Sequence, residues 1–156
     1  MGVSGCGKST VGALLAEALN LRFVDADDLH SETNKTKMAC GIPLDDADRK
    51  PWLDSVGAQL QKGAVVIACS ALRRRYRERL RQSAPWFRLI YLYGTPELLA
   101  HRLNARVHKF MPSMLLSSQL ATLEPPDTDE GAIALNVESA PNILVAYAIR
   151  RICSIE

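Results

Sequence analysis

The stretch Gly2-Val3-Ser4-Gly5-Cys6-Gly7-Lys8-Ser9 decides the fold of this chain, because it fits the pattern G-x-x-x-x-G-K-[ST]. Glycines in such a loop let successive backbone N–H groups turn inward around phosphate oxygens. The residues that follow, 10–19, have the apolar spacing of a helix, and the N-terminal end of a helix attracts anions. The pattern therefore predicts a loop that binds the phosphates of a nucleoside triphosphate.

Two side chains of this loop have specific expected roles. Lys8 is placed to reach the β- and γ-phosphates, and the Ser9 hydroxyl can ligate Mg²⁺. Cys6 lies close to a helix N-terminus, where a thiolate is favoured, so we expect its oxidation to block nucleotide binding. The residues predicted to contact the nucleotide are Gly2, Val3, Ser4, Gly5, Cys6, Gly7, Lys8, Ser9 and Thr10.

The segment before the loop is unusually short. In folds of this type the loop follows a buried central strand, yet only Met1 precedes it here. The sequence therefore predicts a sheet without its first strand. Either an upstream segment lies outside this sequence, or this is a shortened form.

Length and composition restrict the remaining possibilities. The 156 residues fit a single domain spanning 1–156, and the net charge of +2 argues against broad electrostatic capture of nucleic acid. No apolar stretch reaches membrane-spanning length, and the opening lacks the apolar core of a signal peptide, so a cytoplasmic protein is expected. The four cysteines are scattered without a C-x-x-C pair, which predicts neither a zinc site nor a disulfide framework.

Beyond the loop, apolar runs alternate with helical patterns. Strands are predicted at residues 23–24, 64–69, 87–93 and 132–137, and the run 64–69 is expected to be buried on both faces. Helices are predicted at 48–61, around 72–81, from 95 to about 106 and from about 142 to 152. This alternation predicts an α/β fold with a mostly parallel sheet covered by helices on both faces.

Missing motifs narrow the class of nucleotide-binding protein. A GTPase would need N-K-x-D, and Asn34-Lys35-Thr36-Lys37 lacks the aspartate. A motor-type ATPase would carry an acidic pair after the strand at 64–69, where Cys69-Ser70 stands instead. The missing carboxylate favours a small kinase, and such an enzyme needs a closing lid that excludes water.

The expected lid spans residues 106–116. Arg102 and Arg106 lie one helical turn apart before the irregular segment 107–112, and both could bind ATP phosphates or the charge that develops on the transferred group. Solvated arginines at a helix end are an equally good interpretation of this pair.

An acidic cluster, Asp25-Ala26-Asp27-Asp28, follows the second predicted strand and precedes His30. Ligands of parallel sheets bind beyond the carboxyl ends of strands, so this cluster is expected over the site. Asp27 could accept or orient a substrate hydroxyl proton, and His30 could donate to substrate oxygens. Asp25 is expected in the outer shell of Mg²⁺.

Six arginines crowd the segment 73–81. The apolar stripe of that helix leaves most of them on an exposed face, and nucleic-acid binding is a distant second interpretation. Arg73, at the start of the helix, and Arg49, before another helix, are suited to a substrate carboxylate. Together with Asp27 and His30 they predict an acidic polyol as the acceptor.

Several motifs, in order along nearly the whole chain, resemble those of gluconokinases. They are residues 2–10, Asp25-Ala26-Asp27-Asp28-Leu29-His30, residues 37–44, Asp48-Arg49-Lys50-Pro51-Trp52-Leu53, Cys69-Ser70-Ala71-Leu72 with Tyr76-Arg77, and residues 119–124. The resemblance implies ATP-dependent phosphorylation of D-gluconate to 6-phosphogluconate, the P-loop fold of shikimate and nucleoside-monophosphate kinases, a need for Mg²⁺ and a homodimer. It assigns Lys8 and Ser9 to nucleotide and metal, Asp27, His30, Arg49 and Arg73 to the sugar acid, and Arg102 and Arg106 to the lid.

The chain also departs from that family pattern. Family members open with a full first strand, and they read Gly-His-Phe in the lid where this chain has His108-Lys109-Phe110. Loss of the glycine is expected to stiffen lid closure. The alternatives are a kinase for another acceptor, such as shikimate or a nucleotide, and a catalytically silent form that acts as a binding or dimerisation partner.

Overall fold

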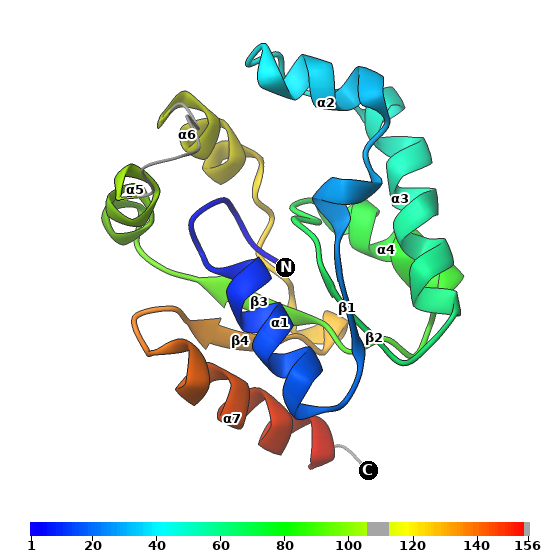
Figure 1. Cartoon of the computed structure of the whole chain (residues 1–156), viewed down its shortest axis with the longest axis vertical. Helices are drawn as coiled ribbons and strands as arrows, with labels where there is room; N and C mark the ends of the chain where they lie inside the picture. Colours follow the sequence, from blue (N-terminus) through cyan, green and yellow to red (C-terminus); the bar gives the residue numbers. More distant parts are fainter. Residues whose placement is uncertain (106–112, 155–156) are drawn as a thin grey trace.

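The sheet is parallel and consists of two strand pairs. The structure, a computed structural model, describes residues 1–105 and 113–154 (Figure 1). Strand β1 (Arg22–Asp25) pairs with β2 (Val65–Ala68), with Arg22 opposite Val65. Strand β3 (Ile90–Tyr93) pairs with β4 (Ile133–Asn136), with Ile90 opposite Ile133. All four strands were predicted, with ends that differ by at most three residues.

Helices cover this sheet and account for the alternation seen in the sequence. The α-helices are α1 (Lys8–Ala18), α2 (Glu32–Ala39), α3 (Asp46–Gln61), α4 (Arg74–Ser83), α5 (Pro96–Asn104), α6 (Ser113–Thr122) and α7 (Pro141–Cys153), and η1 (Ala26–Leu29) and η2 (Thr128–Glu130) are 3₁₀ turns. Helices α1 and α7 pack together, while α3 and α4 form a second pair beside β1 and β2 (Figure 1). The α/β architecture expected from the sequence is confirmed.

The apolar core is divided between two clusters. The larger cluster combines α1, β3, β4 and α7, with Leu99 and Val137 among its most completely buried residues. The smaller one lies against α3 and α4 and centres on Trp52, Val56 and Tyr76. Of the residues described here, no helix has both the length and the apolar character needed to cross a bilayer.

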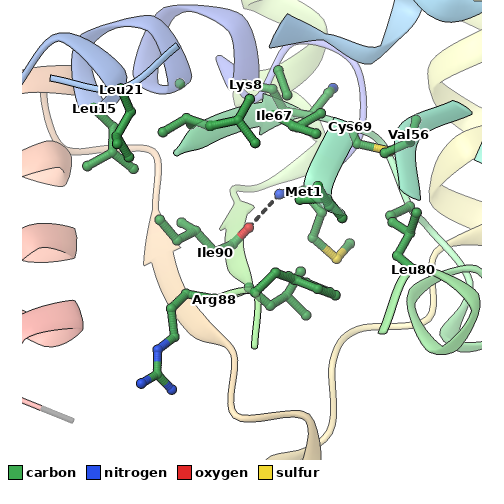
Figure 2. A pocket seen from close by; sticks show the side chains of 18 of the residues that line it. Met1, Lys8, Leu15, Leu21, Val56, Ile67, Cys69, Leu80, Arg88 and Ile90 are labelled. Carbon is green, nitrogen blue, oxygen red and sulfur yellow. Dashed lines mark hydrogen bonds between the residues drawn. The ribbon is translucent and has the colours of Figure 1, made fainter. Parts of the chain in front are cut away.

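Met1 lies between the two strand pairs, where a central strand would end. Its amine donates to the Ile90 carbonyl on β3 (Figure 2), and its own carbonyl accepts from the Leu92 N–H at 2.9 Å. The Gly2 N–H turns the other way and donates to the Ser70 carbonyl beyond β2, at 3.3 Å. Within residues 1–105 and 113–154 no further strand lies between β2 and β3.

Strand β2 corrects one expectation. The apolar run 64–69 was expected to be buried on both faces, but Val65, Val66 and Ile67 are only half-buried, and Ala68 alone is buried within the strand. The reason is that β2 pairs with β1 on one edge and borders a cavity on the other.

The arginine-rich helix α4 corrects a second expectation, that most of its arginines lie on an exposed face. Only Arg75 is exposed among the six arginines of residues 73–81, and the side chain of Arg77 is 1% exposed. Arg77 donates to both carboxylate oxygens of Glu130, at 2.6 and 2.7 Å, and to backbone carbonyls that include those of Ala71 and Glu124. These bonds fasten α4 to the segment before β4. The apolar stripe alone missed the bonds to Glu124 and Glu130 because these acceptors are about 50 residues away in the chain.

Candidate active site

The loop 2–9 has the geometry that its glycines predict. Gly5 and Gly7 have φ angles of 82° and 88°, in the left-handed region that side chains disfavour. A Cβ on Gly5 would lie 2.9 Å from the Leu99 carbonyl oxygen, so the backbone passes too close to α5 for any side chain. Gly7 directly precedes helix α1, whose first N–H groups therefore face the space enclosed by the loop.

Cys6 differs from its sequence-based prediction. Its side chain is 1% exposed and belongs to the larger apolar cluster. A thiol in this position is shielded from soluble oxidants, so it is a packing residue of the loop rather than a switch.

The charged and hydroxyl side chains of the loop are held in place by neighbours. Lys8 Nζ donates to the Val3 carbonyl across the loop at 3.0 Å. The Ser9 hydroxyl donates to Asp25 Oδ2 at 2.6 Å, which joins the start of α1 to the carboxyl end of β1. Hydroxyl and carboxylate oxygens are the ligands that Mg²⁺ prefers, so this pair fits a metal bound between nucleotide and protein.

Asp25 also organises the turn that carries Asp27. Its Oδ1 accepts from the Asp27 N–H at 3.1 Å, which caps η1. The Trp52 indole N–H from α3 donates to the Ala26 carbonyl at 2.7 Å and ties the same turn to the core. Asp27 is thereby presented at an exposed position beside the Ser9–Asp25 pair.

His30 is buried against the same tryptophan. Its ring stacks on the Trp52 indole with a centroid distance of 4.5 Å and an interplanar angle of 8°. Burial, and to a smaller extent the positive charges of Arg49 and Lys35, lower the pKa of His30 to about 4. The imidazole is therefore neutral at pH 7, with Nδ1 3.5 Å from the Asn34 amide nitrogen.

Arg49 lies beside the hydrogen-bonded pair Tyr76 and Asp46, and the charge of Arg73 also acts on the Asp46 carboxylate. The Arg49 guanidinium lies over the Tyr76 ring, 5.8 Å from its centroid, and donates to the Leu44 carbonyl. The Tyr76 hydroxyl donates to Asp46 Oδ1 at 2.5 Å, and this bond is the main cause that lowers the pKa of Asp46. The charges of Arg75 and Arg73 lower it further, which places Arg73 near the same carboxylate.

Cys69 directly follows β2, at the carboxyl end of that strand. Burial raises the pKa of its thiol to about 12, and the charges of Asp27 and Lys8 act on it in opposite directions. Both charges therefore lie near the end of β2. The structure brings together the loop, the Asp25–Asp27 turn and the end of β2, as expected from the common direction of the strands.

Of the two arginines expected in the lid, only Arg102 lies among the described residues. Arg102 lies on α5 and donates to the Val137 carbonyl at 2.6 Å, so in this conformation its side chain is fastened to the end of β4. Arg106 and the residues His108-Lys109 lie outside the described residues, as does most of the expected lid.

Four further residues of this site were not assigned a role from the sequence. Trp52 and Tyr76 support His30 and Arg49, and Asp46 accepts from Tyr76. Gln119 on α6 accepts the Ser4 N–H through Oε1, at 2.7 Å. The capping pattern Asp45-x-x-Asp48 would have placed Asp46 in the first turn of α3, but the contacts of Gln119 join residues 115 positions apart and have no local signal.

Comparisons with known proteins agree with this geometry. The family model described as shikimate kinase matches residues 4–122. A gluconokinase of Gluconobacter oxydans (strain 621H) is 44% identical over 155 residues, which cover 96% of this chain and 87% of that protein. The chain belongs to the gluconokinase family.

Two further gluconokinases support this family assignment. The thermosensitive gluconokinase of Escherichia coli (strain K12) is 38% identical over 170 residues, covering 100% of this chain and 91% of that protein. The crystal structure of a gluconokinase from Sinorhizobium meliloti 1021 superposes with a TM-score of 0.92 at 43% identity, covering 99% of this chain and 90% of that one. The predicted resemblance and the P-loop kinase fold are both confirmed.

Proposed function

We propose that this gluconokinase-family chain transfers the γ-phosphoryl group of ATP to the 6-hydroxyl of D-gluconate, releasing ADP and 6-phosphogluconate. The observation that carries the proposal is the Ser9–Asp25 hydrogen bond, which joins the phosphate loop to the turn that presents Asp27. It supports a nucleotide site and an acceptor site at the same end of the sheet, and the chain is 44% and 38% identical to two gluconokinases.

On the nucleotide side, the residues fit a triphosphate. The inward N–H groups of residues 2–9, the start of α1 and the Lys8 ammonium supply positive potential around it. Ser9 and Asp25 are the residues that would hold Mg²⁺, directly and in its outer shell. Bound Mg²⁺ would neutralise charge on the phosphate oxygens.

On the acceptor side, Asp27 accepts or orients the proton of the attacking hydroxyl, which leaves the oxygen as it bonds to phosphorus. Neutral His30 donates one hydrogen bond and accepts another, so it suits a sugar hydroxyl. Arg49 and Arg73 supply the positive charge for the carboxylate. Because Asp46 already lies near Arg73, the substrate competes with this carboxylate for the guanidinium.

Three broader features belong to the same proposal. Residues 1–156 form one kinase domain with a lid around 106–116, and Arg102 and Arg106 approach the ATP phosphates when this lid closes. The family resemblance supports a homodimer, and the use of ATP supports a cytoplasmic location. The arginines of α4 are engaged with Asp46, Asp54, Asp129 and Glu130, which argues against a role in nucleic-acid binding.

A panel of acceptors tests the proposal. Coupled assays contain ATP·Mg²⁺ and one acceptor, which is gluconate, shikimate or a nucleoside monophosphate. We expect ADP to form only when the acceptor is gluconate. Thermal unfolding with and without ATP·Mg²⁺ serves as the control for folding and binding, because a ligand of the native state raises its stability. A folded, ATP-stabilised protein that forms no gluconate-dependent ADP would refute the activity, and the absence of any thermal shift would favour a silent binding partner.

A further inference from the structure

The segment Asn34-Lys35-Thr36-Lys37, which lacks the aspartate of a guanine reader, joins helix α2 to other parts of the candidate acceptor site. Figure 1 shows α2 beside the start of α3. Lys37 Nζ donates to both carboxylate oxygens of Asp48, at 2.7 and 2.9 Å, and links α2 to the first turn of α3. Asn34 contacts both Asp48 and His30. It is therefore the member of this segment that touches a candidate substrate residue.

Asn34 has a fixed amide orientation. The residue is 4% exposed, and its backbone N–H donates to the Ser31 hydroxyl that caps α2. Its side-chain Nδ2 donates to the Asp48 carbonyl at 2.9 Å. The opposite orientation of the amide would set Oδ1 against that carbonyl oxygen, two acceptors with no proton between them. The Asp48 carbonyl thus decides which end of the amide is the donor.

The same Nδ2 lies 3.5 Å from Nδ1 of the His30 ring. An amide NH₂ group has protons to donate and does not accept, so it can only donate to the ring. At this distance the hydrogen bond is long, but a proton on Nδ1 would point one N–H donor at another. In the neutral ring, Nδ1 is therefore the accepting nitrogen and Nε2 carries the proton.

The His30 ring is also prevented from turning away. It is 7% exposed and stacks on Trp52, which is itself fixed by its hydrogen bond to the Ala26 carbonyl. A half-turn of the ring would place a C–H group against Nδ2 and lose the bond. The charges that act on the ring are those of Arg49 and Lys35, and both oppose a positively charged imidazole.

We propose that Asn34 is a positioning residue of the acceptor site: held by the Asp48 carbonyl, it fixes His30 as the Nε2–H tautomer, so that His30 meets the acceptor as a hydrogen-bond donor only. The inference rests on the proposed function for the identity of that acceptor. The group opposite His30 must then offer a lone pair. A hydroxyl or carboxylate oxygen of a sugar acid does so, whereas an ammonium group does not.

Nitrogen-15 NMR of the His30 ring tests the tautomer directly, because protonated and unprotonated imidazole nitrogens resonate in well-separated regions. Loss of the signals in His30→Gln identifies them among the three histidines of the chain. In the wild type at pH 7 we expect Nδ1 without a proton and Nε2 with one. A proton on Nδ1 would overturn the proposal, and this measurement needs no change at Asn34.

A pair of variants tests whether Asn34 sets the tautomer. Asn34→Asp keeps the shape of the side chain but places an acceptor against Nδ1, so the ring proton should move to Nδ1. Lys35→Met is the matched control, because it changes the net charge by the same single unit near the same ring and leaves Asn34 in place. At pH 9 we expect a protonated Nδ1 in Asn34→Asp alone. An unprotonated Nδ1 in that variant would refute the role of Asn34.

Steady-state kinetics at pH 9 separate positioning from stability. Without its Nε2 proton the ring cannot donate, so the KM for gluconate in Asn34→Asp should exceed that in Lys35→Met by about tenfold or more. The KM for ATP should agree within about twofold between the two variants. Equal KM values for gluconate would refute the donor role of His30. If the wild type forms no ADP with gluconate, the proposed function fails, while the nitrogen spectra still decide the tautomer.

Discussion

Asp27 and Asp28 share one exposed turn, but only Asp27 directly follows the Ala26 carbonyl that Trp52 anchors. If Asp27 orients the acceptor hydroxyl, Asp27→Asn should lower kcat by about 10²-fold or more while leaving the KM for ATP nearly unchanged. Asp28→Asn is the matched control and should retain most of the activity. Steady-state kinetics measure both variants. Equal losses of kcat in the two would contradict the assignment of this role to Asp27.

His30 makes stability depend on pH. Its pKa of about 4 in the native state lies below the ordinary 6.5, so the unfolded chain takes up a proton first as the pH falls. The stabilisation is complete above pH 6.5 and is lost progressively down to pH 4, by up to about 3 kcal/mol. Urea unfolding of the wild type and of His30→Gln at several pH values isolates this effect, because the acidic groups titrate in both. If the unfolding free energies of the two proteins changed in parallel with pH, this contribution of His30 would be ruled out.

At the scale of elements, the Arg77–Glu130 pair fastens α4 to η2 from within the protein. Arg77→Met leaves the buried Glu130 carboxylate without its partner and should cost about 3–5 kcal/mol of unfolding free energy. Arg75→Gln, on the same helix, removes an exposed pair with Asp46 and should cost at most about 1 kcal/mol. Denaturant unfolding measures both, and similar costs would mean that the buried pair does not anchor the helix.

The sequence was most informative where structure is local. The phosphate loop, the helix after it and all four strands follow from short patterns, because turn chemistry and apolar spacing act over a few residues. Helix α2 was missed although Ser31 caps it by accepting the Asn34 N–H. The half-exposure of β2 could not follow from its apolar run, since burial of a strand depends on which neighbours lie beside it.

For the molecule as a whole, the parallel direction of the strands explains why the residues of the candidate site could be expected at one edge of the sheet. Residues after β1 and β2 and the loop after Met1 all emerge at one edge of the sheet, so Asp27, Arg73 and Lys8 were expected there. The side chains that hold the candidate site in place could not be predicted. Trp52, Tyr76 and Gln119 act through contacts between segments that are distant in the chain. Such contacts become visible only once the elements are packed.

The central claim is that the phosphate loop of this chain delivers a phosphoryl group to gluconate. Phosphorus NMR of a mixture of protein, ATP, Mg²⁺ and gluconate measures this directly, since it distinguishes a sugar-acid phosphate ester from inorganic phosphate. We predict that the ester signal grows as the γ-phosphate signal of ATP declines, and that Lys8→Met lowers the rate by at least about 10²-fold. Formation of inorganic phosphate alone, or an undiminished rate with Lys8→Met, would contradict the account.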